Sequence, residues 1–317
     1  MHARRFLRLL AAPLWAASAL RLACNTAWIE HTPQAYTFKN TYKGDTPGVL
    51  VSGGAASLSD ASIDLAANAE TQGLKQYATH RNYRLIYVIV EVSYRLVARR
   101  DAGVARLADL RGKRIGTASG SSAEVFVRQL LSTAGLAHAD YTLVSGGVCM
   151  RAPCAAGSFP AMLRDRKIDA FGIWEPAVEL GVQAVGEAEA VLFQNASVYR
   201  EIYSLYSTVE KLRDPPTRKK IVEFVRALNQ TLDLFRNEPD KVYAAVGQTV
   251  GVDVPVLKDV WADHKWGPGS LGPDLLDYLV VEDEYLAKTD KRAGISRADL
   301  AKFIDTSVYD EALALKG

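Results

Sequence analysis

Residues 109–131, DLRGKRIGTASGSSAEVFVRQLL, restrict the possible folds of this chain more than any other stretch. Their pattern predicts a short strand at 114–117, a loop of small residues at 118–122 and a helix at 123–131. A strand, a Gly/Ser loop and a helix N-terminus together present backbone N–H groups and hydroxyls, which suit a polar or anionic ligand group. Helix capping by a loop serine is the simpler interpretation of the same residues. The glycine spacing fits neither a Walker A loop nor a dinucleotide fingerprint, so nucleotide binding is disfavoured.

The composition is that of an ordinary globular protein. A chain of 317 residues favours about two domains, and 49% hydrophobic with 23% charged residues excludes a disordered or fibrous class. The net charge is +2 and the basic residues are scattered, which disfavours nucleic acid as a partner. We expect no cofactor.

The first 19 residues have the pattern of a secretory signal peptide. Three arginines precede the apolar residues 9–17, and the triplet Ala-Ser-Ala at 17–19 resembles a cleavage site. We therefore predict export to the periplasm or the medium. The alternative is an unstructured extension. A lipoprotein site at Cys24 is disfavoured because Arg21 stands where that pattern needs an apolar residue.

Three cysteines are present, and two of them are five positions apart. In an oxidising compartment, Cys149 and Cys154 are expected to form a disulfide that closes their loop. A metal site needs more ligands, and no histidine is near these two in sequence, so we expect no metal. Cys24 is left without a cysteine partner.

Alternation of strands and helices predicts an α/β protein. We expect helices at 34–42, after residue 71 as far as residue 77, at 160–166 and repeatedly from 215 onward. The run RLIYVIV at 84–90 is typical of a strand buried on both faces. Further strands are expected at 49–51, 63–66, 141–144, 167–173 and 191–193.

The segment 96–131, with its DLRGKRIG core, resembles the periplasmic substrate-binding proteins of nitrate, sulfonate and taurine importers, within the NMT1/THI5-like superfamily. The sequence KIDA at 167–170 followed by WEP at 174–176 matches the pattern of that family, and so does DLA at 64–66. The order and spacing of these motifs extend the resemblance over roughly residues 20–250.

The resemblance implies a type II periplasmic-binding-protein-like fold with two lobes. Each lobe would contain a mixed, mostly parallel sheet flanked by helices, and two crossing segments would form the hinge. The expected limits are 20–96 plus 204–317 for lobe 1 and 97–203 for lobe 2. A small-molecule ligand would bind between the lobes, an ABC permease in the membrane would be the partner, and the protein would be a monomer.

Candidate ligand-binding residues lie at the ends of the predicted strands, where loops of both lobes meet. An aromatic face and tight glycine loops favour an organic ligand there, although packing and turn formation explain the same residues without one. The candidates are Asn25, Trp28, His31, Ser52, Gly53, Gly54, Asn68, Glu70, Thr71, Glu91, Tyr94, Ser119, Gly120, Ser121, Ser122, Trp174 and Glu175.

Two of the three acidic candidates could select the ligand. If Glu70 and Glu175 both face the cleft, their carboxylates would prefer amine, amidine or ring N–H groups to an anion such as nitrate. The arginine-rich loops expected of a sulfonate binder are absent from these strand ends.

An enzymatic alternative depends on Cys24. The superfamily contains an aryl-sulfinate desulfinase with a cysteine nucleophile after its first strand, and His31 could lower the pKa of the Cys24 thiol. The other catalytic residues of that enzyme have no match here, and the cysteine-rich motif of the thiamine-precursor synthases is missing. We therefore expect a binding protein without catalysis, with a buried inert Cys24.

Overall fold

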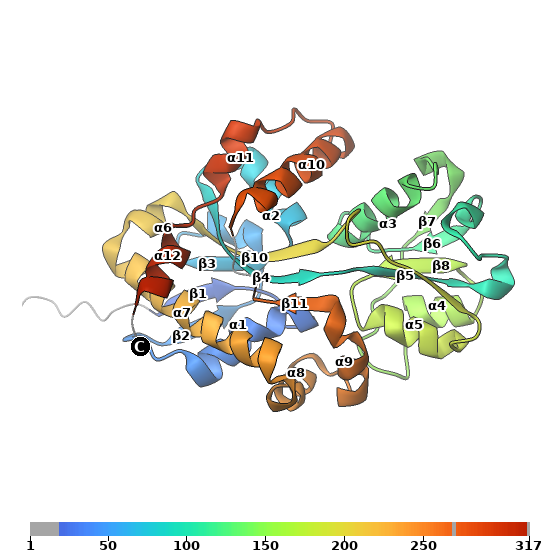
Figure 1. Ribbon diagram of the computed structural model, residues 1–317, viewed down its shortest axis with the longest axis horizontal. Helices are drawn as coiled ribbons and strands as arrows, with labels where there is room; N and C mark the ends of the chain where they lie inside the picture. The colour runs from blue at the N-terminus through green and yellow to red at the C-terminus, as the bar shows by residue number, and fades with distance from the viewer. Residues whose placement is uncertain (1–18, 268–270, 316–317) are drawn as a thin grey trace, which may run out of the picture.

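The computed structural model describes residues 19–267 and 271–315 and contains two β-sheets flanked by helices (Figure 1). The first sheet has the strand order β11-β4-β10-β3-β1-β2 and the second has the order β7-β6-β8-β5-β9. The strands are β1 (Leu20–Ala23), β2 (Gly48–Val51), β3 (Leu65–Asn68), β4 (Tyr83–Val92), β5 (Arg95–Arg99), β6 (Arg114–Gly116), β7 (Thr142–Val144), β8 (Ala170–Ile173), β9 (Ala190–Phe193), β10 (Glu201–Thr208) and β11 (His264–Trp266). This arrangement confirms the predicted two-sheet α/β fold.

Both sheets are mixed, but they are less parallel than predicted. Strands β1, β2 and β3 pair in parallel, as do β6, β7 and β8. The strands near the crossings between the sheets are antiparallel to their neighbours: β10 to β3 and β4, β11 to β4, and β5 to β8 and β9. A strand that returns from the other sheet enters from the opposite end, which reverses its direction.

The chain passes between the sheets twice, at residues 93–94 and 194–200. These passages lie within ten residues of the predicted lobe limits, and the division into two lobes remains our proposal. The predicted signal peptide lies outside the described residues except for Ala19.

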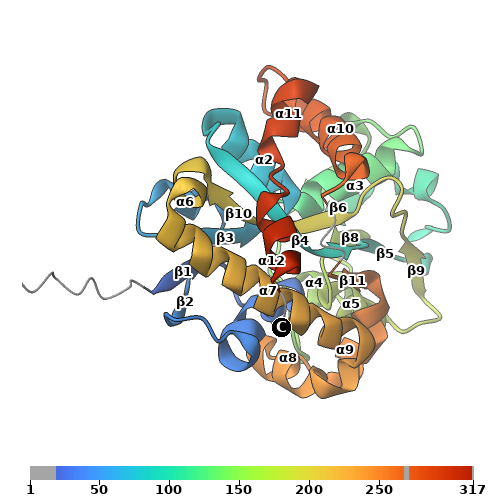
Figure 2. The same cartoon turned by 60° about the vertical axis from the view of Figure 1, so that its left-hand side comes forward.

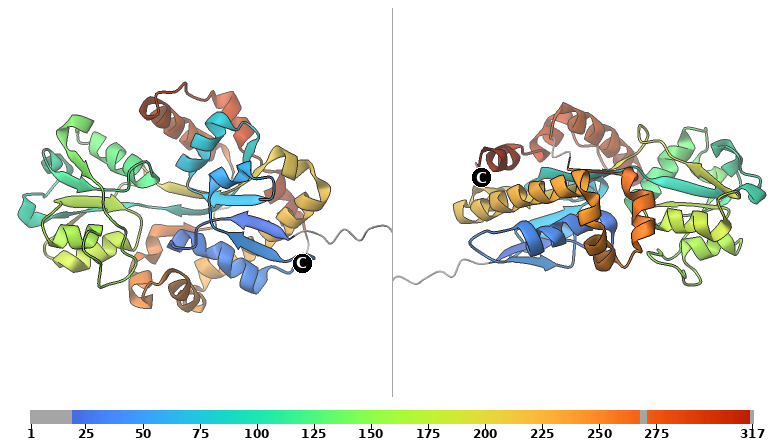
Figure 3. Two further views of the ribbon diagram at one scale, coloured as in Figure 1. Left: turned by 180° about the vertical axis from the view of Figure 1, so that it is seen from behind. Right: turned by 60° about the horizontal axis from the view of Figure 1, so that its bottom comes forward.

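Helices cover both faces of each sheet (Figures 1 and 3). The second sheet carries α3 on one face and α4 and α5 on the other (Figure 3). Within residues 19–267 and 271–315, no helix combines the length and the apolarity needed to cross a bilayer. The α-helices are α1 (Thr32–Tyr36), α2 (Glu70–Thr79), α3 (Ser122–Ser132), α4 (Phe159–Arg164), α5 (Ala177–Val185), α6 (Val209–Arg213), α7 (Pro215–Asn237), α8 (Tyr243–Val250), α9 (Val254–Val260), α10 (Pro273–Thr289), α11 (Arg297–Phe303) and α12 (Ser307–Ala314).

Short helical segments complete the chain, and one of them corrects the predicted start of a helix. The segment η1 (Ile29–His31) leads directly into α1, so helical structure begins five residues before the expected residue 34. Pro33 fits the first turn of α1 because the N–H group that proline lacks has no partner there. The others are η2 (Thr37–Thr41), η3 (Ala55–Ser59), η4 (Arg100–Ala102), η5 (Leu107–Leu110), η6 (His138–Asp140), η7 (Pro239–Lys241) and η8 (Trp261–Asp263).

The apolar core is continuous from one sheet to the other. Strand β4 is buried on both faces, as its sequence predicted, and lies between β10 and β11. Helix α7 packs along the first sheet with α12 beside it (Figure 2). Burial of each large apolar side chain of β4 contributes about 1.5–3 kcal/mol to the stability of the fold. The strand that leads into the crossing at residues 93–94 is therefore firmly held in the core.

Candidate functional site

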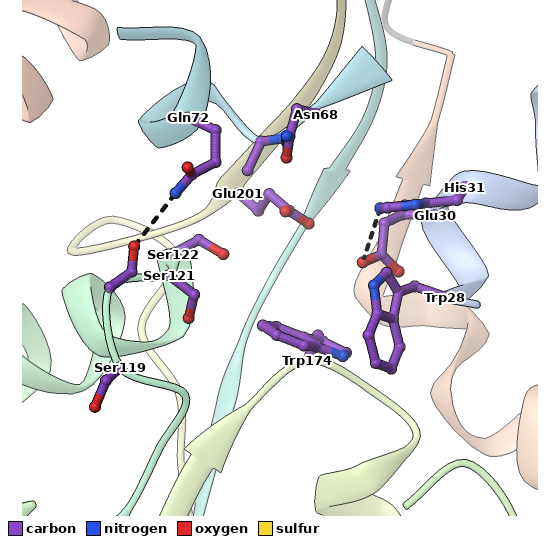
Figure 4. A pocket seen from close by; sticks show the side chains of 12 residues that line it. Trp28, Glu30, His31, Asn68, Gln72, Ser119, Ser121, Ser122, Trp174 and Glu201 are labelled. Carbon is purple, nitrogen blue, oxygen red and sulfur yellow. Dashed lines mark hydrogen bonds and ion pairs between the residues drawn. The ribbon is translucent and has the colours of Figure 1, made fainter. Parts of the chain in front are cut away.

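A cavity of about 290 Å³ lies between the two sheets (Figure 4). The loops after β1, β6 and β8, the end of β3 with the start of α2, and the first residue of β10 surround it. Carboxyl ends of parallel strands are the usual place for a ligand in α/β proteins, and this volume is near the lower limit of ordinary small-molecule sites. The lining residues are Trp28, Glu30, His31, Asn68, Ala69, Gln72, Ser119, Gly120, Ser121, Ser122, Trp174 and Glu201.

Two indole rings, one from each half of the fold, meet at the cavity. The ring centroids of Trp28 and Trp174 are 5.0 Å apart and the ring planes are inclined by 62°. Both side chains are half-buried, and the Nε1 of Trp174 has no hydrogen-bond partner. The pair gives the cavity an aromatic wall that either an apolar or a cationic group can contact.

Two carboxyl groups, Glu30 from η1 and Glu201 from β10, also line the cavity. Glu30 is 2% exposed and Glu201 is 3% exposed, and Oε2 of each lacks a hydrogen-bond partner. Burial raises the pKa of Glu30 to about 8. Burial, with the nearby charges of Glu30 and Glu70, raises the pKa of Glu201 well above its ordinary value. Burial therefore favours the protonated form of both carboxyl groups at neutral pH.

His31 is a neutral group in this setting. Its ring stacks on Tyr203 at a centroid distance of 4.4 Å, Nδ1 contacts the carbonyl oxygen of Asn25, and Nε2 lies 3.9 Å from Oε1 of Glu30. Burial lowers the pKa of His31 to about 3, so its imidazole carries no charge at physiological pH.

The Gly/Ser loop forms the opposite side of the cavity. Ser121 caps α3, as predicted, because its hydroxyl accepts a hydrogen bond from the N–H of Ala123 at 3.1 Å. The N–H of Gly120 donates to the carboxylate of Glu124 at 2.8 Å. The N–H group of Gly120, which was expected to face a ligand, is therefore already bonded to Glu124.

A second cavity of about 260 Å³ shares Trp28, His31, Asn68 and Gln72 with the first. It brings Asn25, Gly53 and Gly54 into the same region. Eleven of the candidate residues therefore line one cavity or the other: Asn25, Trp28, His31, Gly53, Gly54, Asn68, Ser119, Gly120, Ser121, Ser122 and Trp174.

The predicted acidic residues do not face the cavity. The carboxylate of Glu70 is fully buried and accepts from the Tyr199 hydroxyl at 2.9 Å and from the N–H of Ile202 at 2.6 Å. Glu175 forms an ion pair with Arg95 at 2.6 Å. Both carboxylates connect structural elements, so the condition for their selecting a ligand is not met.

The remaining four candidates also lie outside both cavities. Glu91 pairs with Arg200 at 3.0 Å, and the Tyr94 hydroxyl is 3.1 Å from that of Ser122. Thr71 is fully buried in α2, and Ser52 is in an exposed turn.

Cys24 follows β1 but lines neither cavity. Burial raises the pKa of its thiol to about 12, and a neutral His31 has no charge with which to oppose this. The lowering of the thiol pKa by His31, which the enzymatic alternative requires, is therefore not found, and the expected burial of Cys24 is confirmed. Cys149 and Cys154 form the predicted disulfide, and the described residues contain no cluster of three or more metal-ligating side chains.

Four residues that line the main cavity were not predicted from the sequence: Glu30, Ala69, Gln72 and Glu201. Gln72 lies one helical turn after the end of β3, and its spacing from Asn68 could have identified it. Glu201 could not be found by searching strand ends, because it begins an antiparallel strand. Its position depends on the pairing of β10 with β3, in which Ser204 lies opposite Asn68.

Solved structures with this fold include sulfonate-binding proteins and one enzyme. The alkanesulfonate-binding protein SsuA from Xanthomonas axonopodis pv. citri, bound to MOPS, aligns with a TM-score of 0.68 and 17% identity over 91% of this chain and 98% of that one. The periplasmic aliphatic sulphonate binding protein SsuA from Escherichia coli aligns with a TM-score of 0.68 and 17% identity over 91% of this chain and 92% of that one. The desulfurization enzyme DszB aligns with a TM-score of 0.60 and 15% identity over 93% of this chain and 98% of that one. At these identities the similarity shows the fold alone.

A search of curated proteins finds no match to this sequence. The family model described as NMT1/THI5 like matches residues 56–242, which is more than half of the chain and includes the DLRGKRIG and KIDA motifs. The chain therefore belongs to the NMT1/THI5-like family.

Proposed function

We propose that this protein is an exported solute-binding protein that captures a small organic molecule between its two lobes and delivers it to an ABC-type importer. The observation that carries the proposal is the cavity, which combines an aromatic wall with polar groups from both sheets. A ligand in that position contacts both lobes at once, so binding stabilises the closed arrangement that a permease can recognise.

Cys24 supports binding without covalent chemistry. Its thiol lies outside the cavity and its pKa is raised to about 12, so a ligand meets no thiolate. The similarity in fold to DszB extends to the chain path and supplies no nucleophile at this cavity.

The experiment that tests the function is a thermal-shift screen against sulfonates, nitrate, pyrimidines, amines and aromatic sulfinates, with each compound recovered for analysis. A ligand at about 100 times its Kd should stabilise the fold by about 2.7 kcal/mol, which raises the melting temperature. Trp174→Ala should weaken the binding of any active compound by more than about fivefold, because truncating an aromatic anchor commonly costs over 1 kcal/mol.

Leu192→Ala is the matched control, since Leu192 is an exposed apolar residue on the edge strand of the same sheet. It should leave the shift unchanged. Consumption of the compound would contradict the binding function and favour an enzyme. The absence of a shift with every class would contradict capture of these solutes.

A further inference from the structure

The ionisable side chains that line the main cavity are two carboxyl groups, Glu30 and Glu201, and one histidine, His31. Among the described residues around it there is no lysine or arginine, and His31 is neutral. Lys75 lies outside the lining, where its ammonium contacts the carbonyl oxygen of Gly120 at 3.3 Å and Asp290 at 3.9 Å. A sulfonate or nitrate ion would therefore find no positive counter-charge in the cavity.

The two acidic side chains that line this space have unused hydrogen-bonding capacity. Glu30 and Glu201 are more than nine-tenths buried, both line the cavity together with Trp28 and Trp174 (Figure 4), and Oε2 of each has no hydrogen-bond partner. A buried acceptor without a partner costs about 1–3 kcal/mol, so a bound donor would recover that energy.

The groups packed against these two carboxyls do not neutralise them. Glu201 faces Glu70 from α2, Glu30 from η1 and the hydroxyl of Tyr94, whereas Glu30 faces His31 and Tyr203. The tyrosine pKa values are raised well above their usual range, so the tyrosines carry no charge. Among the described residues that line the cavity, no cationic group stands beside these two carboxyls.

We propose, on the basis of the binding function above, that the ligand is a small organic cation whose amidinium, guanidinium or protonated ring nitrogen donates to Glu30 and Glu201 beside the two indoles. Charge-assisted N–H···O bonds are about twice as strong as neutral ones, and an indole face also attracts a cation. The neutral hydroxyls and amides across the cavity contact the remainder of the ligand.

Binding of such a cation has a definite pH dependence. The pKa of Glu30 is about 8 in the empty cavity, so a cation must displace a proton to pair with its carboxylate. As the pH rises toward 8, affinity for a permanently charged cation should increase by up to about tenfold per pH unit for each carboxyl group that ionises. An anion held by the protonated carboxyl groups would behave in the opposite way and would bind more weakly as the pH rises.

Calorimetric titration with three phenyl compounds tests the sign of the charge that the cavity prefers. Benzamidinium, benzamide and benzenesulfonate share a flat ring and differ in charge, and benzamidinium remains protonated between pH 6 and pH 8. We expect benzamidinium to bind best, to bind more tightly at pH 8 than at pH 6, and to release protons to the buffer. Glu30→Gln and Glu201→Gln should each reduce its affinity by at least about tenfold and reduce the pH dependence.

Glu210→Gln is the control, because Glu210 of α6 accepts a hydrogen bond from Asn82 and lines neither cavity of the site. The wild-type pH profile keeps the test valid even if a cavity variant folds poorly. Tighter binding of benzenesulfonate or benzamide, or affinity that falls with pH, would overturn the cation proposal and leave the binding function standing. If all three probes fail while another compound of the solute screen binds, a cationic compound supports the cation proposal and an anionic or neutral compound overturns it. If nothing binds in either experiment, both proposals fail.

Discussion

The thiol of Cys24 shows how burial sets the chemistry of a single residue. It directly follows β1, next in space to Tyr203 of β10, and is 2% exposed. Desolvation disfavours the thiolate, and a pKa of about 12 leaves about one thiol in 10,000 ionised at pH 8. His31 does not lower the pKa of this thiol, because burial keeps its imidazole neutral.

We predict that Cys24→Ala preserves ligand affinity within about twofold, since Cys24 is not among the residues that line either cavity. In the wild-type protein, alkylation of Cys24 at pH 8 should be slow while the fold is intact and fast in denaturant, as mass spectrometry can follow. Rapid labelling of the native protein, or loss of turnover of any compound in the variant, would support the enzymatic alternative.

Some residues of the site lie at the carboxyl ends of parallel strands, and others do not. Trp28, Asn68 and Trp174 follow parallel strands, so the alternating pattern and the rule of carboxyl ends predicted their region. Glu201 begins an antiparallel strand, and Glu30 lies in a helical turn whose start was placed too late. Long-range pairing decides the position of Glu201, and no local pattern records it.

At the scale of the element, the strand-loop-helix unit of β6 and α3 was predicted almost completely because its signals are local. Gly116 ends β6 and is required by packing. A Cβ atom there would lie 2.7 Å from Cδ1 of Phe159 and 2.9 Å from both Ile168 and Phe171. The fully buried rings of α4 and β8 thus press against the main chain just before the Gly/Ser loop.

We predict that Gly116→Ala lowers the free energy of unfolding by about 1–3 kcal/mol through overpacking, as measured by urea denaturation. Gly294→Ala is the matched control because its added Cβ would meet nothing closer than 3.8 Å. Equal stability of the two variants would show that the core around β6 yields to an extra methyl group.

At the scale of the whole molecule, polar contacts span the cleft and hold the two sheets together. Lys75 Nζ and Gln72 Nε2 of α2 donate to the carbonyl oxygen of Gly120 at 3.3 and 3.4 Å. Gln129 of α3 donates to Glu282 of α10 at 2.9 Å. These hydrogen bonds join α2 to the loop before α3, and α3 to α10.

We predict that the double variant Lys75→Ala/Gln129→Ala raises the ligand dissociation rate by up to about fivefold for each hydrogen bond removed, because partly exposed polar interactions contribute about 0–1 kcal/mol each. Stopped-flow displacement measures the rate, and solution scattering should show a larger radius of gyration without ligand. Lys302→Ala, which removes an exposed ion pair within α11, should change neither quantity. Unchanged kinetics and scattering would mean that the cleft closes without these hydrogen bonds.

The carbonyl oxygen of Gly120, which accepts the hydrogen bonds from α2, belongs to the main chain. Ligand preference and the contact between the sheets therefore depend on different atoms of this loop. Gly120 has a φ of 75°, which favours glycine, while the carbonyl it presents to α2 is independent of any side chain. The serines on either side can therefore be exchanged without removing the closing contact. Ligand preference in this loop is free to diverge, during evolution or in the design of biosensors, while the mechanical response to binding is retained.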